Sequence, residues 1–141
     1  MHYFYIEPEV AGGLGPNTVR DRSVHPPIVS HLNYEFDGWP DDVLVEAFPS
    51  FIVTPDAMDK LLESGLTGAR FANVEISKSG EFEDFYPDTQ LPRFVWLQIT
   101  GRPGRDDFGL AADHRLVISE RALDVLKGLQ LTHALIEPFG N

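Results

Sequence analysis

The chain contains the same strand-helix-strand pattern twice. The segment Phe51–Val74 aligns without a gap with Leu116–Phe139. The alignment pairs Thr54 with Ser119, Ala57 with Ala122, Asp59 with Asp124, Leu61 with Leu126, Leu66 with Leu131, Thr67 with Thr132 and Ala69 with Ala134. In each copy an apolar run is followed by a helix with one apolar face and then by a second apolar run. The repeat therefore predicts two similar units that pack together as a pseudo-symmetric core.

Both predicted helices begin with the same kind of residue. Thr54 and Ser119 are good N-caps, because a hydroxyl side chain accepts a hydrogen bond from a free backbone N–H of the first turn. Pro55 suits the first helical position, since its φ angle is already helical, and Gly65 ends the first helix. The second helix is predicted over Glu120–Leu129.

The remainder of the chain predicts short strands and long turns. Strands are expected at His2–Ile6, Ile28–Leu32, Asn33–Phe36, Phe71–Ile76, Arg93–Thr100, Leu116–Ile118 and Ala134–Phe139. The segment Asp42–Phe48 fits a short helix or a strand. The Gly- and Pro-rich stretch before it excludes a long helix and is a candidate contact surface or lid.

These elements predict one α+β domain over residues 1–141. Its sheet is expected to be mixed or antiparallel and covered by two helices, which come from duplicated units at residues 51–74 and 116–139.

The composition limits the partners that the chain can bind. The 22 Asp and Glu against 11 Lys and Arg give a net charge of -11, which disfavours binding to nucleic acid or an anionic membrane. An acidic surface attracts a basic protein partner, although it also simply favours solubility. The chain has no Cys for disulfides or thiolate metal sites, no signal-like N-terminus and no apolar run of about 20 residues. A cytoplasmic location is expected.

No motif for catalysis, a cofactor or a metal is found, so none of these is predicted. Gly13-Leu14-Gly15 lacks the third Gly of a dinucleotide-binding turn, because Thr18 stands in its place. The five histidines, none of them paired at helical spacing for zinc, are His2, His25, His31, His114 and His133. A site that forms only in the folded chain, such as Asp113 with His114, stays open.

The best candidates for partner contacts are acidic residues beside aromatic ones. Carboxylates steer a basic partner and rings anchor it, although such rings also serve to pin a loop to the core. The first choice is a predicted loop that contains Glu81, Phe82, Glu83, Asp84, Phe85 and Tyr86. Asp106 and Asp107 follow the predicted central strand, and the second choice is Trp39 with Asp41 and Asp42.

The duplicated unit resembles the C-terminal part of bacterial immunity proteins that are encoded beside polymorphic or contact-dependent toxins. The likeness is carried by Leu116–Leu126 (LVISERALDVL) with Leu131-Thr132, and by Phe51–Phe71. It is similar to the closing "VSER...L...GLTG" segment of the myxobacterial and double-Cys-x-x-Cys-Gly immunity proteins. This chain lacks the cysteines of the latter group, so their zinc module is not expected, and His133 stands where that turn has Gly.

The resemblance implies a cytoplasmic protein that binds a cognate, basic toxin domain and blocks its active site or substrate face without doing chemistry. A homodimer is compatible with that role. Two alternatives stay open. One is an adaptor or scaffold of a secretion system, and the other is a small hydrolase or toxin-modifying enzyme that uses Asp113 and His114 or the loop of His25 and His31.

Overall fold

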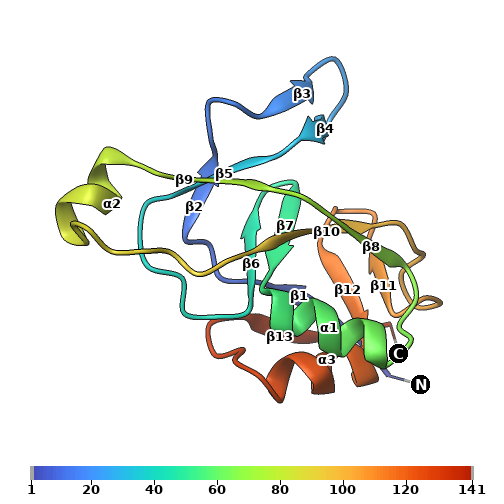
Figure 1. Ribbon diagram of the computed structural model, residues 1–141. Helices are drawn as coiled ribbons and strands as arrows, with labels where there is room; N and C mark the ends of the chain where they lie inside the picture. The colour runs from blue at the N-terminus through green and yellow to red at the C-terminus, as the bar shows by residue number, and fades with distance from the viewer. Residues whose placement is uncertain (1, 141) are drawn as a thin grey trace.

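The computed structural model describes residues 2–140, and in it each duplicated segment contributes two strands to one of two equivalent four-stranded sheets (Figure 1). The first sheet has the order β6 (Leu44–Ala47), β7 (Ser50–Val53), β10 (Val95–Ile99) and β8 (Ala69–Ala72). The second sheet has the order β11 (Phe108–Leu110), β12 (Leu116–Ser119), β1 (Tyr3–Glu7) and β13 (Leu135–Phe139). All neighbouring strands in both sheets are antiparallel.

Each copy of the repeat has one strand inserted between its own two strands. In the first sheet β10 separates β7 from β8, and in the second sheet β1 separates β12 from β13. The inserted strand β10 follows its copy in the sequence, whereas β1 comes from the N-terminus. The first strand of the chain therefore completes the second copy, and the two halves are intertwined.

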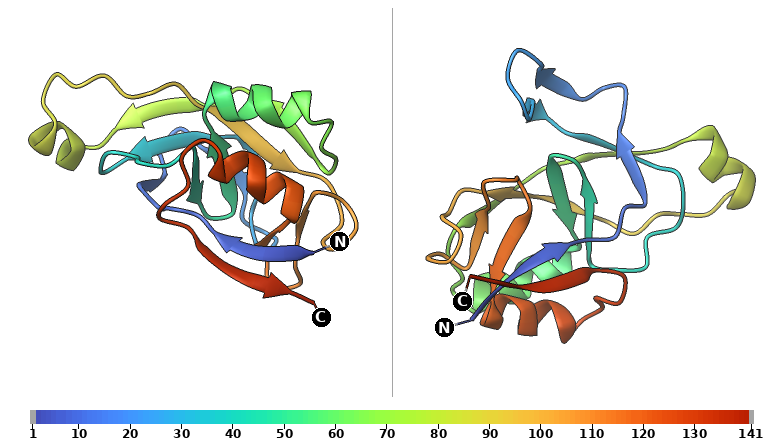
Figure 2. Two further views of the ribbon diagram at one scale, coloured as in Figure 1. Left: turned by 90° about the horizontal axis from the view of Figure 1, so that it is seen from below. Right: turned by 180° about the vertical axis from the view of Figure 1, so that it is seen from behind.

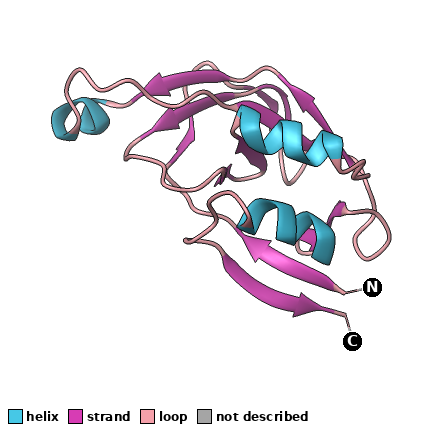
Figure 3. Ribbon diagram, turned by 60° about the horizontal axis from the view of Figure 1, so that its bottom comes forward, coloured by secondary structure: helices cyan, strands magenta, loops and turns pink. Residues whose placement is uncertain are grey.

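The two repeated helices begin where the sequence predicts. Helix α1 (Pro55–Glu63) is capped by Thr54, and α3 (Glu120–Lys127) by Ser119. The two cap hydroxyls lie 3.3 Å from the Ala57 amide and 3.2 Å from the Ala122 amide. Helix α3 ends at Lys127, earlier than predicted, because Gly128 forms its C-cap. The helices lie side by side and contact each other (Figure 3).

Two apolar cores occupy the two faces of the first sheet. The core on the helical side joins both sheets and both helices, with Phe51, Leu61, Leu97, Leu116 and Leu126 fully buried. The opposite face packs on a three-stranded sheet of β2 (Gly12–Leu14), β5 (Asn33–Phe36) and β9 (Glu75–Lys78). The predicted α+β domain is confirmed.

Two further elements lie on the outside of this body. One is an arm formed by the strands β3 (Val19–Asp21) and β4 (Ile28–His31), and the other is the short helix α2 (Gly80–Phe85) at one end of the molecule (Figures 1 and 2). Helix α2 replaces the loop expected here, because Ser79 accepts a hydrogen bond from the Phe82 amide at 3.1 Å and caps a helical turn.

Other boundaries differ from the sequence prediction. The single strand expected at Phe71–Ile76 is wrong, because β8 pairs with β10 while β9 pairs with β5 in a different sheet. The segment Asp42–Phe48, for which the sequence allows a short helix or a strand, contains the strand β6. None of the helices within residues 2–140 has the length and apolar character that crossing a membrane requires.

Candidate functional site

Helix α2 presents aromatic side chains to solvent at the end of the molecule. Phe82 is 0% exposed and anchors the helix in the second core, whereas Phe85 is 70% exposed and Tyr86 is 38% exposed. The Tyr86 ring lies 5.2 Å from the Phe82 ring and 6.3 Å from the ring of the half-buried Trp39. Trp39, a residue of the second-choice group, therefore joins the first-choice residues at one surface.

Four exposed acidic residues stand next to these rings along the chain, namely Glu81, Glu83, Asp84 and Asp88. The nearby Lys78 directs its ammonium group to the Thr89 carbonyl and lies 5.7 Å from the centre of the Phe82 ring. Within residues 2–140 none of the four acids forms an ion pair. We call Glu81, Glu83, Asp84, Phe85 and Tyr86, together with Trp39, the α2 surface.

Three residues that were expected to be exposed are buried, which corrects their assignment as contact residues. Phe82 is the first. Asp42 is 3% exposed, since its carboxylate accepts hydrogen bonds from the Thr132 and His133 amides at 2.9 and 2.7 Å. Asp107 is 5% exposed and accepts hydrogen bonds from Ser119 at 2.6 Å and from Arg121. Both carboxylates stabilise the fold instead of facing a partner.

The environment of Asp107 keeps its carboxyl group ionised. Burial raises its pKa, but hydrogen bonds from Arg121, Ser119 and the Thr67 amide lower the pKa by a larger amount. The pKa of Asp107 therefore lies well below its usual range. The Arg121 guanidinium lies 2.8 Å from the Asp107 carboxylate and also donates to the Ser64 and Gly65 carbonyls that end α1.

The other predicted acids lie away from α2. Asp106 is half-buried, and its carboxylate accepts a hydrogen bond of 2.7 Å from the Arg102 amide, which closes the loop between β10 and β11. That loop lies at the end of the molecule opposite to α2 (Figures 1 and 2). Asp41 is exposed and lies 3.1 Å from the His133 ring nitrogen. The structure therefore separates the predicted contact residues into several places.

Of the histidines that the sequence leaves as candidate catalytic residues, only two lie near each other. The His25 and His114 rings lie 6.1 Å apart, whereas His31 lies 2.9 Å from Glu75. The Asp113 carboxylate is engaged by Arg115 at 2.8 Å. Within residues 2–140, no hydrogen bond joins the Asp113 and His114 side chains. The hydrolase alternative therefore gains no hydrogen-bonded acid and base pair from this arrangement.

A small cavity beside His114 holds an unusual carboxyl group. The volume of the cavity is 150 Å³, and Glu7, Glu46 and His114 are among the residues that line it. Burial and the neighbouring charge of Glu7 raise the pKa of Glu46 to about 7. No local pattern in the sequence signals this, because the two glutamates lie on strands far apart in the chain.

One further cluster has the donor types of a divalent metal site. Glu9, Asp41 and His133 place one ligand atom each within 4.8 Å of one another. The Glu9 carboxylate, however, accepts hydrogen bonds from the Asp41 and Asp42 amides at 3.0 and 2.9 Å. These bonds and the contact between Asp41 and His133 account for the arrangement, so we assign no metal to it.

Comparison with known proteins assigns no family to this chain. No protein-family model matches the chain, and neither a curated protein nor a solved structure is significantly similar to it.

Proposed function

We propose that this chain is a cytoplasmic immunity protein that binds a cognate bacterial toxin and covers its active site or substrate face. The observation that carries the proposal is the α2 surface, where exposed rings stand among carboxylates that have no ion-pair partner within residues 2–140. The proposed role is binding alone, with no catalytic residue, cofactor or metal.

The chemistry of the α2 surface suits a basic protein partner. Aromatic residues supply much of the binding energy of protein interfaces, and carboxylates raise the rate at which a basic partner associates. Because Phe82 fixes α2 in the core, Phe85 and Tyr86 are held in place before binding, which lowers the entropy cost of the complex.

The proposal is tested with the product of the neighbouring gene. We expect the two proteins to purify together as a one-to-one complex, and co-expression to protect cells from that product. Replacing Glu83→Lys and Asp84→Lys is expected to slow association at least about tenfold, because two attractive charges become repulsive. The control Asp59→Lys with Asp124→Lys makes the same change of charge on the exposed faces of α1 and α3 and is expected to retain binding.

Two outcomes would contradict the proposal. One is a neighbouring gene product that is not toxic and does not bind. The other is an ordered homo-oligomer that engages several partners, which would favour an adaptor or scaffold. Light scattering during size-exclusion chromatography separates a one-to-one complex from such an assembly.

A further inference from the structure

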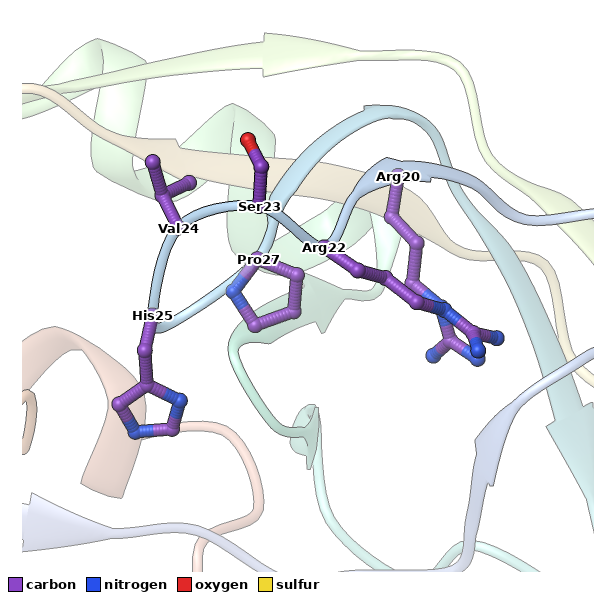
Figure 4. Close-up of a pocket in the computed structure, with 6 residues that line it drawn as sticks. All are labelled: Arg20, Arg22, Ser23, Val24, His25 and Pro27. Carbon is purple, nitrogen blue, oxygen red and sulfur yellow. The ribbon is translucent and has the colours of Figure 1, made fainter.

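An open groove lies between the β3–β4 arm and the first sheet. It consists of two adjoining cavities of 300 and 540 Å³, which share Val24 and Pro27 in their linings. Figure 4 shows the smaller cavity, where the side chains of Arg20 and Arg22 extend to the same side of the arm. We call the two cavities together the arm groove.

The arm is fastened to the body at both ends, so the arm groove exists before a ligand binds. At the base, Glu75 accepts a hydrogen bond of 2.7 Å from Asn17 and contacts His31 at 2.9 Å. At the tip, the His25 ring packs 6.1 Å from the His114 ring and 6.3 Å from the Phe48 ring.

The charged side chains that line the arm groove are basic, in a chain with 22 acidic and 11 basic residues. Arg20 and Arg22 line the smaller cavity and Arg70 lines the larger one, and no Asp or Glu lines either. The intervening Asp21 is bound by the Ser23 amide and hydroxyl at 2.9 and 2.6 Å. Within residues 2–140 none of the three arginines forms an ion pair. Guanidinium groups without an ion-pair partner favour a carboxylate ligand.

The walls of the larger cavity are mostly apolar. Val24 and Ile28 come from the arm and are 44% and 62% exposed, and Trp96, which is 9% exposed, comes from the first sheet. Among the described residues β4 pairs only with β3, so one edge of β4 has no strand partner. An extended peptide can add to such an edge while its side chains enter the neighbouring groove.

We propose that the arm groove binds an extended segment of a partner protein that carries aliphatic side chains and at least one carboxylate. The inference rests on the proposed function, because it takes the occupant to be part of the same partner protein. It adds that the partner presents an acidic and aliphatic segment to the arm as well as a basic surface to α2.

The test is a selection of random displayed peptides on the immobilised chain. We expect the enriched peptides to combine Asp or Glu with aliphatic residues. Replacing Arg20→Gln and Arg22→Gln is expected to weaken their binding at least about tenfold, because two charge-assisted contacts are lost. The control Arg102→Gln with Arg105→Gln removes the same charge from another exposed loop and is expected to bind normally. In a Trp39→Phe background, the fluorescence of Trp96 reports binding in the groove.

The inference would be overturned by a lack of enrichment, by enriched peptides without acidic residues, or by binding that the Arg20→Gln and Arg22→Gln changes leave intact. Enrichment of basic peptides alone, bound at α2, would overturn it while supporting the proposed function. A dimer of the chain that the same arginine changes dissociate would show that the groove holds a second copy, and this also overturns it.

Discussion

Asp42 and Asp107 occupy equivalent positions in the two repeats, and each binds the threonine of the other repeat. The Asp42 carboxylate accepts hydrogen bonds from the Thr132 amide and hydroxyl at 2.9 and 3.0 Å. The Asp107 carboxylate contacts the Thr67 amide and hydroxyl at 2.9 and 3.3 Å. The repeat thus extends upstream of Phe51 and Leu116, and its two copies are tied together by a reciprocal pair of contacts.

Removing either carboxylate should destabilise the fold. We expect Asp42→Ala and Asp107→Ala each to lower the free energy of unfolding by about 2–4 kcal/mol, because buried donors lose their acceptor. The larger loss is expected for Asp107→Ala, which also leaves Arg121 and Ser119 without their acceptor. Urea denaturation measures both. The matched control is Asp59→Ala, because Asp59 is exposed. A surface change of this kind is expected to alter stability by roughly 0.5 kcal/mol or less, and equal effects at all three positions would contradict this account.

The two helix caps should differ in strength although their positions are equivalent. Ser119→Ala is expected to cost about 2–3 kcal/mol, because its buried hydroxyl donates to Asp107 at 2.6 Å as well as capping α3. Thr54→Ala should cost about 1 kcal/mol, since its hydroxyl only caps α1. Thermal and urea unfolding of the two variants compare them directly. Equal losses would show that the bond between Ser119 and Asp107 adds nothing.

The features that the sequence predicted follow local rules. The caps Thr54 and Ser119 are found as expected, because each cap contacts a residue only three positions away. The long apolar run of β10 likewise predicted an interior strand. Helix α2 was missed, since a helix as short as Gly80–Phe85 shows no helical periodicity.

The remaining features depend on contacts between distant segments. The insertion of β1 between β12 and β13 joins the two ends of the chain, and no local pattern announces it. Asp42 and Asp107 looked like exposed loop acids because their donors lie in the other repeat. The two repeats also differ at one aligned position, where the first has Gly68 and the second has His133. This difference too depends on a contact with a distant segment. A Cβ atom at Gly68 would lie 2.3 Å from the Phe108 carbonyl, so the first copy requires Gly there.

The aromatic residues of α2 should separate stability from binding. Phe82→Ala is expected to lower the free energy of unfolding by about 3–5 kcal/mol, because it leaves a cavity in the second core. The ring of Phe85, in contrast, is 70% exposed. Phe85→Ala is therefore expected to change stability by roughly 0.5 kcal/mol or less. Denaturation curves measure both effects. A large loss of stability in Phe85→Ala would mean that its ring packs on the body and is not free to contact a partner.

The stability of the chain should depend on the ionisation of Glu46. The pKa of this carboxyl is raised from 4.5 to about 7 in the folded chain, so the folded state holds the proton more tightly than the unfolded state does. As the pH rises from 4.5 to about 7, the wild-type chain therefore loses stability, and above that range the loss stays constant. Replacing Glu46→Gln removes the ionisation. The variant is expected to be about 1 kcal/mol more stable than wild type at pH 8, or about 3 °C in Tm, after allowance for solvent screening of a partly exposed group.

Well below pH 4.5 the difference between Glu46→Gln and wild type should disappear, because the wild-type carboxyl is then neutral in both states. Thermal unfolding at several pH values measures this. Replacing Glu7→Gln serves as the matched test of the cause, since it removes the neighbouring charge and leaves Glu46 in its cavity. It is expected to reduce the pH dependence without abolishing it, because burial is the larger contribution. A stability difference between Glu46→Gln and wild type that is the same at acidic and alkaline pH would show that Glu46 ionises normally and that the cavity beside His114 does not desolvate it.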